Sequence, residues 1–325
     1  MTYTVALIGL GGIGWRYDVG LPENNYALSH ARAFKLHPDF NLLVGIDASK
    51  IAREEFQKET NIQSCGSYTS YFSENEIDIV VIATPTETHL QIVDQILLVA
   101  SPKLIFCEKP VSNTFDDASA IANKCAKKNT KLYVNYIRRA DPAVLEVRNR
   151  IASGDIIEPY KAVIWYSKGL LHSGTHFLDL MIFWFGPVIS WSIISTGVSG
   201  NNRSEPDILL KFKKITAIFC SASEGDYSHF SVEIIARNGR LSYQPSGRIF
   251  WQKTGFDSGF AHDKRLLPYA EEIPSDMNYY QYRIASEISL AMKNKLNVLC
   301  DGSLALENVK ILTNILDAVK KYVDK

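Results

Sequence analysis

The sequence predicts two domains, and the first of them is an α/β domain with a parallel sheet. The chain has 325 residues, which is longer than a single hydrophobic core usually supports. Short apolar runs alternate with helical patterns through residues 1–137, as in proteins whose strands are joined by crossover helices. A glycine-rich turn follows the first apolar run directly. We therefore place the first domain at residues 1–137 and the second at residues 138–325.

The composition is typical of a globular protein, with 46% hydrophobic and 22% charged residues. Lys and Arg together number 35, as do Asp and Glu, and no long block of like charge occurs, which argues against a nucleic-acid partner. The first residues lack a basic segment followed by an apolar run and a cleavage site, so we expect a cytoplasmic protein. The most apolar window, 177–198, is interrupted by Asp179 and Gly186-Pro187, and predicts a core helix and a strand, with no membrane span.

The cysteines argue against both a disulfide framework and a zinc site. Their number is odd, they are widely scattered, and none shows C-x-x-C spacing. We therefore expect thiols and no metal. Cys107 ends an apolar strand, so we interpret it as a buried thiol and keep a nucleophilic role as the alternative.

The first motif is the glycine-rich turn. Residues 5–8 predict a short strand, and residues 9–14 then read Gly-Leu-Gly-Gly-Ile-Gly, the G-x-G-x-x-G pattern of a Rossmann dinucleotide-binding turn. In this pattern the first glycine permits a tight turn, the second lets the backbone approach a pyrophosphate, and the third allows close helix packing. Helix-terminal N–H groups would then meet the phosphates. The cofactor-binding candidates of this turn are Gly9, Gly11, Gly12, Ile13 and Gly14.

The second motif is an acidic residue at the end of the next strand, 41–46. Asp47 occupies the place where a Rossmann unit binds the adenosine ribose hydroxyls. Its carboxylate would repel a 2′-phosphate, so the sequence favours NAD, although Lys50 and Arg53 would weaken that preference and leave NADP as the alternative.

Asp47 follows Gly14 by more than the usual spacing of about 20 residues, so we infer an insertion. Residues 15–29 contain Gly20, Pro22 and two adjacent Asn residues and predict a loop, while a helical pattern resumes at residues 30–34. The loop would lie beside the cofactor phosphates. It is either a lid or a surface excursion without a role.

The third and fourth motifs follow two further strands. Residues 77–83 form a buried strand that leads to Thr84, Pro85 and His89, where the carboxyl ends of parallel strands bind ligands. Thr84 and Pro85 would line the nicotinamide side, and Thr86 is more simply a helix cap. After a helix at 91–100, the strand 103–107 leads to Glu108-Lys109-Pro110.

Proline restricts the backbone of the residue before it, so Lys109 is held in an extended geometry at the end of a strand. That is a suitable position for a catalytic amine, and the alternative is a solvated Glu-Lys pair. A helix at 114–127 and a strand at 131–135 complete the alternation, and Asp141-Pro142 predicts the start of a helix that ends near Ser153.

Taken in order, these motifs resemble those of the glucose-fructose oxidoreductase / inositol dehydrogenase / rhizopine catabolism protein family. The resemblance rests on the glycine turn, Asp47, Thr84-Pro85 with His89, Glu108-Lys109-Pro110, and Arg138-Arg139 with Pro142. Residues 172–179, which read His-Ser-Gly-Thr-His-Phe-Leu-Asp, look like that family's helix with an acidic-x-Gly-x-His-x-x-Asp pattern. The match covers nearly the whole chain.

The resemblance implies an α/β Rossmann domain plus a C-terminal α+β domain with a large, mostly antiparallel open sheet. It also implies a homo-dimer or tetramer formed through that sheet. The local pattern agrees, because residues 159–166 alternate as a strand and 177–185 predict a helix. Asn238-Gly239 predicts a hairpin turn, and amphipathic helices are expected near 279–292 and 304–322.

By the same resemblance, Lys109 is the general acid/base at the reacting oxygen and His176 is its partner. His172 stands where many members carry an aspartate, and it supplies no fixed negative charge. Its spacing of four residues from His176 lets both face the site, so the catalytic candidates are Lys109, His176 and His172. Asp179 either orients His176 or pairs elsewhere in the core.

The resemblance therefore implies an NAD(P)-dependent oxidoreductase that moves a hydride between nicotinamide and a sugar, nucleotide sugar or polyol. The sugar class rests on the resemblance alone. Two alternatives remain, a non-catalytic dinucleotide-binding regulator and an NAD-dependent glycoside-cleaving enzyme. Arg138, Arg139 and Lys168 either meet an anionic group of the substrate or are solvated.

Overall fold

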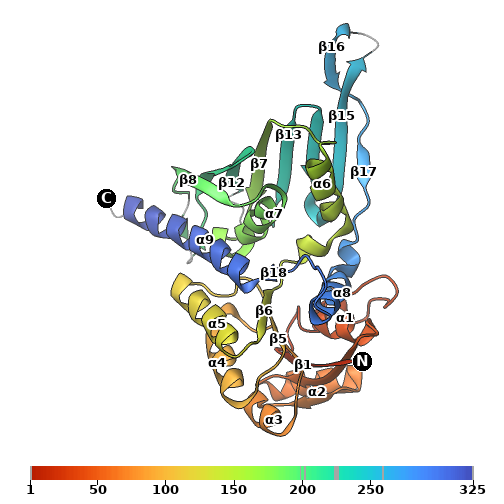
Figure 1. The fold of residues 1–325 in the computed structure, drawn as a ribbon, viewed down its shortest axis with the longest axis vertical. Helices are drawn as coiled ribbons and strands as arrows, with labels where there is room; N and C mark the ends of the chain where they lie inside the picture. The colour runs from red at the N-terminus through yellow and green to blue at the C-terminus, as the bar shows by residue number, and fades with distance from the viewer. Residues whose placement is uncertain (1, 198, 201–202, 223–226, 258–259, 324–325) are drawn as a thin grey trace. The chain divides into compact units, whose positions relative to one another are not determined.

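The computed structural model describes residues 2–197, 199–200, 203–222, 227–257 and 260–323. It divides the chain into two compact units (Figure 1). The first unit comprises Met1–Ala140 and Asn278–Lys310, and the second comprises Asp141–Met277 and Ile311–Lys325. The first division falls close to the predicted boundary at residue 137. The prediction placed the two domains one after the other in the sequence, whereas the segment Asn278–Lys310 returns to the first unit.

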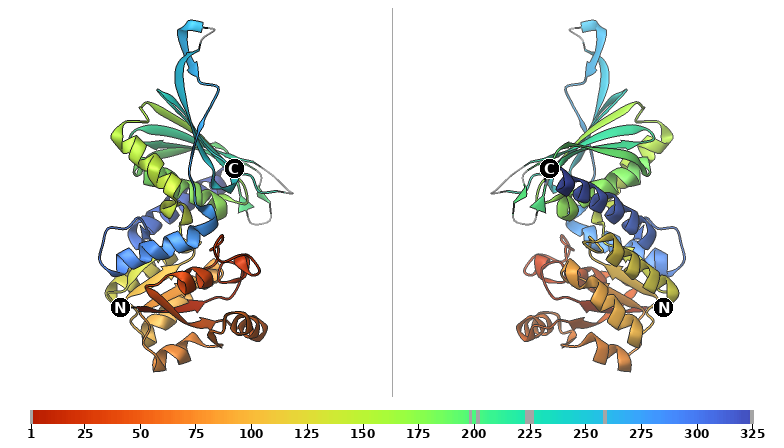
Figure 2. Two further views of the ribbon diagram at one scale, coloured as in Figure 1. Left: turned by 90° about the vertical axis from the view of Figure 1, so that its right-hand side faces the viewer. Right: turned by 90° about the vertical axis from the view of Figure 1, so that its left-hand side faces the viewer.

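The first unit is built on a seven-stranded sheet with the order β18-β6-β5-β4-β1-β2-β3. Figure 2 shows this unit, which contains the N-terminus, from two further sides. Neighbouring strands run parallel except for β18, which is antiparallel to β6. The predicted parallel α/β sheet is thus confirmed. The strands are β1 (Tyr3–Ile8), β2 (Phe40–Ile46), β3 (Gln63–Cys65), β4 (Ile79–Ile82), β5 (Leu104–Cys107), β6 (Lys131–Val134) and β18 (Cys300–Asp301).

Helices cover both faces of this sheet, because alternate residues of each strand point to opposite sides. On β1, Val5 and Leu7 join a core cluster with residues of α1, α2 and α8, whereas Ala6 and Ile8 join a second cluster with residues of α3, α4 and α5. The helices are α1 (His30–Leu36), α2 (Lys50–Thr60), α3 (Tyr68–Glu74), α4 (His89–Val99), α5 (Phe115–Lys127), α8 (Tyr280–Met292) and α9 (Gly302–Val323), of which α9 continues into the second unit.

Short polar side chains fix where several of these helices begin. The hydroxyl groups of Ser29, Ser49, Ser67 and Thr114 accept hydrogen bonds from N–H groups in the first turns of α1, α2, α3 and α5. Each cap follows the carboxyl end of a strand or a loop. The helices therefore start at the edge of the sheet where the predicted site residues lie.

The second unit holds a nine-stranded sheet with the order β16-β15-β14-β13-β7-β12-β11-β8, in which β17 also pairs with β15. Among the described strands of this sheet only β7 and β12 pair in parallel, so the predicted mostly antiparallel sheet is confirmed. The strands are β7 (Tyr160–Tyr166), β8 (Val188–Ser195), β11 (Asp207–Phe212), β12 (Ile215–Ser221), β13 (Ser231–Ala236), β14 (Gly239–Tyr243), β15 (Ile249–Asp257), β16 (Phe260–Leu266) and β17 (Glu271–Ile273). A separate two-stranded ribbon joins β9 (Ser199–Gly200) to β10 (Arg203–Ser204).

One face of this sheet packs against α7 (Thr175–Phe185). The ring of Phe177 lies 6.5 Å from that of Tyr243, and the ring of Phe185 lies 5.4 Å from that of Tyr160. The indole of Trp184 donates to the carbonyl oxygen of Val144 in α6 (Pro142–Ser153). The apolar window around α7 is therefore core, as predicted.

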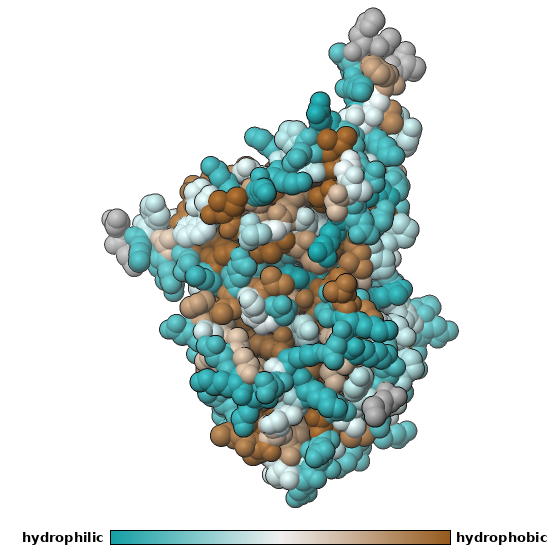
Figure 3. All heavy atoms as spheres, in the orientation of Figure 1, coloured by the Kyte–Doolittle hydropathy of each residue, from teal (hydrophilic) through white to brown (hydrophobic). Residues whose placement is uncertain are grey.

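In the described part of the chain, no helix has the length and hydropathy needed to cross a membrane. Hydrophilic and hydrophobic residues are interspersed over the face drawn in Figure 3.

Candidate cofactor site and catalytic residues

The glycine turn lies between β1 and the insertion, at the carboxyl end of the strand. Gly9 has a φ of +99°, and a Cβ atom there would lie 2.5 Å from the carbonyl oxygen of Ala83. A Cβ atom at Gly14 would lie 2.1 Å from the carbonyl oxygen of Gly9. Both positions therefore require glycine, since a side chain would displace backbone atoms.

Gly11 differs from these two, because a Cβ atom there would meet nothing within 4 Å. Among the residues that the structure describes, the N–H groups of Gly11, Gly12 and Ile13 donate to no acceptor. Consecutive unused N–H groups beside open space are the arrangement that binds phosphate oxygens. The turn thus fits the pyrophosphate of a dinucleotide.

Asp47 is tied to this turn. Its Oδ2 accepts a hydrogen bond from the N–H of Leu10 at 2.8 Å, and its Oδ1 accepts one from the N–H of Ser49 at 2.8 Å. The carboxylate is therefore held at the end of β2 with further lone pairs available. That geometry suits hydrogen bonds from ribose hydroxyls.

The two cations near Asp47 are engaged with other groups. The ammonium of Lys50 lies 3.6 Å from the carboxylate of Glu54 in an exposed pair. One Nη1 of Arg53 donates to the carbonyl oxygens of Asp47 and Ala48, at 2.7 and 2.9 Å. Neither cation is hydrogen-bonded to the carboxylate of Asp47, which therefore keeps its negative charge exposed to a ligand.

The segment after β4 is fixed by His89. This side chain is fully buried, and its Nε2 and Nδ1 lie 3.0 and 3.1 Å from the carbonyl oxygens of Thr84 and Val111. The hydroxyl of Thr84 lies 2.8 Å from that of Thr88. The imidazole of His89 thus faces protein carbonyl groups, and it holds the turn of Thr84 and Pro85 beside the turn that follows Lys109.

Glu108 is the centre of a polar cluster at the end of β5. Its Oε1 accepts hydrogen bonds from His30 Nε2 at 2.8 Å and from Asn135 Nδ2 at 2.7 Å. Burial alone would raise the pKa of the Glu108 carboxyl, but the bonds from His30 and Asn135 and the charge of Lys109 lower it overall. Glu108 is therefore an anion bound on two sides.

Lys109 is half-buried and follows Glu108 directly. Burial lowers the pKa of the Lys109 ammonium to about 8, the carboxylate of Glu108 opposes this effect, and the guanidinium of Arg138 lowers the pKa further. The peptide bond from Lys109 to Pro110 is cis. An amine with this pKa exchanges protons near neutral pH, as a general acid or base must.

The remaining candidate near this strand is Cys107. It is fully buried, and burial raises the pKa of its thiol well above the ordinary value. A thiol of this kind is not a nucleophile. Of the two interpretations of Cys107, the structure therefore supports the buried core residue. In the described parts of the chain, no three His, Cys, Asp or Glu side chains are placed to hold a metal ion.

His172 and His176 lie in the second unit. His172 is exposed and belongs to a π-helical turn, Leu170–Gly174, that continues into α7, while His176 is partly exposed and Asp179 is buried. The expected regular α-helix across both histidines is therefore interrupted by a wider turn, of a kind that often occurs at functional sites. Their relation to Lys109 remains a prediction.

The basic residues singled out in the sequence differ in exposure. Arg138 and Arg139 are buried in the first unit, so the interpretation as solvated charges fails for both. Lys168 is exposed in the second unit, with a φ of 61°.

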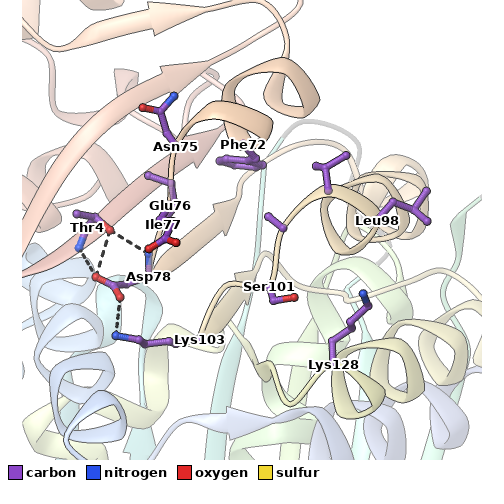
Figure 4. A pocket seen from close by; sticks show the side chains of 12 residues that line it. Thr4, Phe72, Asn75, Glu76, Ile77, Asp78, Leu98, Ser101, Lys103 and Lys128 are labelled. Atoms are coloured by element: carbon purple, nitrogen blue, oxygen red, sulfur yellow. Dashed lines mark hydrogen bonds and ion pairs between the residues drawn. The ribbon is translucent and has the colours of Figure 1, made fainter.

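A cavity of about 680 Å³ opens at the opposite edge of the first sheet (Figure 4). It lies at the amino ends of β1, β4 and β5, where Asp78 accepts hydrogen bonds from Thr4 and pairs with Lys103 at 2.7 Å. Ligands of parallel sheets bind at the carboxyl ends of the strands. Asp78 and Lys103 in this cavity pair with each other, and we assign the site to the glycine-turn edge.

Two site residues were not predicted from the sequence. Asn135 follows the carboxyl end of β6, so the rule that identified Lys109 would also have identified it. His30 carries no such signal, because its contact with Glu108 depends on how the preceding insertion is folded.

Comparisons with known proteins agree with this geometry. Residues 3–136 match the sequence model of an oxidoreductase family with an NAD-binding Rossmann fold. The scyllo-inositol 2-dehydrogenase (NAD(+)) of Bacillus subtilis (strain 168) is 27% identical over 190 residues, which cover 54% of this chain and 50% of that protein. The rhizopine catabolism protein MocA of Rhizobium meliloti is 35% identical over 210 residues, which cover 59% of this chain and 61% of that protein. This chain thus spans about half the length of the first relative.

Among solved structures, the WlbA dehydrogenase from Bordetella pertussis in complex with NADH and UDP-GlcNAcA superposes with a TM-score of 0.77. The alignment covers 98% of this chain and 96% of that chain at 16% identity. At this identity the likeness shows a common fold, and it extends over both units.

Proposed function

We propose that this chain, whose residues 3–136 match the Gfo/Idh/MocA oxidoreductase family, is an NAD(P)-dependent dehydrogenase or reductase acting on a CH–OH group. The substrate class that we propose is a sugar, a nucleotide sugar or a polyol. The names of the relatives support this class, and the observation that carries the chemistry is Lys109, an amine of pKa about 8 on the same sheet edge as the glycine turn.

Lys109 has the role of general acid and base in this proposal. Nicotinamide supplies a hydride acceptor or donor when the dinucleotide is bound. When the carbon of a CH–OH group gives up a hydride, its hydroxyl oxygen must lose a proton as the C=O bond forms, and the neutral amine of Lys109 takes that proton. In the opposite direction the ammonium of Lys109 donates a proton to the carbonyl oxygen. Glu108 holds the backbone beside the amine, since His30 and Asn135 fix its carboxylate.

His176 and His172 complete the proposal on the side of the second unit. The partly exposed imidazole of His176 is the partner of Lys109 at the substrate oxygen, and His172 binds a substrate hydroxyl or relays a proton. An imidazole at residue 172 supplies no fixed negative charge. We therefore expect the pH dependence of the reaction to follow Lys109.

NAD is the preferred cofactor in this proposal. The carboxylate of Asp47 is held in place by two backbone N–H groups, and it would lie next to a 2′-phosphate. We expect the dissociation constant of NADP to exceed that of NAD by at least about tenfold, the ratio that corresponds to 1.4 kcal/mol. Equal or tighter binding of NADP in calorimetric titrations would contradict this preference.

We also propose a cytoplasmic homo-oligomer that associates through the open face of the large sheet. Support for the interface comes from apolar side chains on that face, including Trp165, which is 42% exposed, and Ile235, which is 48% exposed. Apolar residues on an exposed sheet face commonly mark contact with another chain.

The test of the catalytic proposal is the variant Lys109→Ala. The purified protein is incubated with NAD and a panel of sugars, nucleotide sugars and polyols, and absorbance of reduced nicotinamide is followed. We expect kcat of the variant to fall roughly 10²–10⁴-fold, because general acid-base catalysis contributes about that factor to the rate. The variant should bind NAD normally. The matched control is Lys128→Ala, which removes a lysine that lines the cavity at the opposite edge of the sheet.

Two results would contradict the proposal. Wild-type turnover in Lys109→Ala would remove Lys109 from the chemistry. Dinucleotide binding without turnover of any substrate in the panel would favour the regulatory alternative, and release of a glycoside's aglycone would favour the glycoside-cleaving one.

A further inference from the structure

The insertion, residues 15–29, folds back onto the glycine turn. The N–H groups of Trp15 and Arg16 donate to the carbonyl oxygen of Gly11, at 3.1 and 3.3 Å, and the N–H of Tyr17 donates to that of Gly12 at 3.0 Å. The turn of a Rossmann domain normally leads straight into a helix. Here the chain first closes a set of turns around the same glycine carbonyls.

A buried carboxylate fastens the far end of the insertion to its beginning. Asp18 is 2% exposed, and its oxygens accept hydrogen bonds from the N–H of Leu28 at 2.8 Å, the N–H of Ser29 at 2.9 Å and the hydroxyl of Ser29 at 2.8 Å. Breaking these bonds would leave a buried carboxylate without donors, which is strongly unfavourable. The two ends of the insertion are therefore held together.

Arg32 in α1 fastens the middle of the insertion. Its guanidinium donates to the carbonyl oxygens of Asp18, Leu21 and Tyr26, at 2.6, 2.9 and 3.4 Å. One side chain thus satisfies backbone acceptors at three points of the insertion. A loop that opened as a lid would have to give up these bonds together.

The segment that returns to the first unit adds a third attachment. The N–H of Ala27 donates to the carbonyl oxygen of Asn278 at 2.8 Å, and the hydroxyl of Tyr280 donates to that of Leu28 at 2.6 Å. The insertion is therefore bound to the start of α8 as well as to α1.

Tyr17 is the side chain of the insertion that meets the glycine turn. A Cβ atom at Gly12 would lie 2.4 Å from Cε1 of Tyr17, so the ring packs directly against the Cα atom of Gly12. Most of Tyr17 is nevertheless open to solvent, since the residue is 58% exposed. The N–H group of Gly12 is one of those in the turn that donate to no acceptor among the described residues.

We propose that residues 15–29 form a fixed wall of the dinucleotide site and that Tyr17 is a cofactor-contacting residue. A pyrophosphate that reaches the N–H groups of Gly11, Gly12 and Ile13 passes beside the ring of Tyr17. Because the wall is formed before binding, little binding free energy is lost to ordering the loop. The contact with the ring of Tyr17 slows release of the ligand. This inference rests on the proposed dinucleotide function. It gives the insertion a role in that function, where the alternative was a surface loop without a role.

The binding test compares wild type with Tyr17→Ala, Tyr17→Phe and the control Tyr269→Ala, an exposed tyrosine of the second unit. NAD is titrated by calorimetry, and its release is followed by stopped-flow protein fluorescence. We expect Tyr17→Ala to weaken NAD binding about tenfold, mainly through faster release, which corresponds to the loss of one aromatic contact. Tyr17→Phe and Tyr269→Ala should bind as wild type does. Wild-type affinity in Tyr17→Ala would overturn the assignment of Tyr17.

The wall is tested separately by amide hydrogen exchange of residues 15–29 without and with NAD. A fixed wall exchanges slowly in both cases, whereas rapid exchange that slows only when NAD binds would show a lid and overturn the proposal. If the wild-type protein binds neither NAD nor NADP, the dinucleotide function and the role of Tyr17 fall together. If wild type binds NAD and Tyr17→Ala binds equally well, only the role of Tyr17 falls.

Discussion

At the scale of single residues, the pKa of Lys109 sets the pH dependence of the proposed reaction. Burial lowers it to about 8, so the neutral amine becomes the major form as the pH rises through that value. We therefore expect kcat/KM for alcohol oxidation to rise with pH and to level off above about 8, and the reverse reaction to slow over the same interval. A profile that is flat across pH 8 in both directions would argue against Lys109 as the titrating group.

The neighbours of Lys109 provide a paired test of this assignment. Glu108 raises the pKa of Lys109 and Arg138 lowers it, so Glu108→Gln should move the midpoint of the oxidation profile to lower pH and Arg138→Gln should move it to higher pH. The control is Asp78→Asn, a carboxylate change at the opposite edge of the sheet, which should leave the midpoint in place. Shifts in the same direction for Glu108→Gln and Arg138→Gln would contradict the electrostatic explanation.

Two glycines of one turn should respond differently to the same substitution. At Gly11 a Cβ atom meets no protein atom within 4 Å, so Gly11→Ala should change the free energy of unfolding by no more than about 0.5 kcal/mol while weakening NAD binding about tenfold or more. At Gly14 the added atom would lie 2.1 Å from the carbonyl oxygen of Gly9, so Gly14→Ala should lose both stability and binding. Thermal denaturation and NAD titration of both variants separate the two effects. Normal binding by Gly11→Ala would show that the pyrophosphate does not approach there.

At the scale of elements, the helix α6 begins after Asp141, whose carboxylate accepts four hydrogen bonds. Oδ1 of Asp141 accepts hydrogen bonds from the N–H groups of Ala143 and Val144, and Oδ2 accepts them from the hydroxyl of Ser275 and the N–H of Asp276. We expect Asp141→Ala to lower the free energy of unfolding by about 1–2 kcal/mol, the upper range for loss of a helix cap. Asp141→Asn should recover part of this loss, because its amide oxygen still accepts at the cap. Urea denaturation measures both, and equal stability of Asp141→Ala and wild type would show that the cap contributes nothing.

The elements around the site also explain why the insertion is tolerated. The turn, α1 and the start of α8 each supply hydrogen-bond partners to residues 15–29, so the loop adds satisfied backbone groups to the first unit. His30, the first residue of α1, then reaches Glu108. The insertion is therefore followed directly by a residue of the polar cluster beside Lys109.

At the scale of the whole molecule, the open face of the second sheet is the proposed interface between copies of the chain. Trp165 on β7 pairs with Ser231 on β13, and Lys161 pairs with Ile235, so these side chains share one face. We expect Trp165→Glu to shift the protein to a smaller assembly in sedimentation velocity, because it places a charge in an apolar contact. Tyr269→Glu, a control on an exposed residue between β16 and β17, should not change the assembly. An unchanged oligomer in Trp165→Glu, or a monomeric wild type, would exclude this face.

The architecture was largely predictable because its signals are local. Periodicity and the glycine turn predicted the parallel sheet, and the resemblance implied the antiparallel one. The rule that ligands bind at the carboxyl ends of parallel strands placed Asp47, Thr84 and Lys109 at one edge. These residues follow strands whose apolar pattern can be read directly, so their positions required no knowledge of distant contacts.

The sequence by itself determined the two sheets, the dinucleotide turn and the lysine at the end of β5. Only the tertiary structure showed that His30 and Asn135 meet at Glu108, that His89 faces protein carbonyl groups, and that Asn278–Lys310 returns to the first unit. The physical reason is the same in each case. A strand or a turn is encoded by neighbouring residues, whereas a hydrogen bond between residues far apart in the chain, or the choice of core for an apolar helix face, depends on the packed fold.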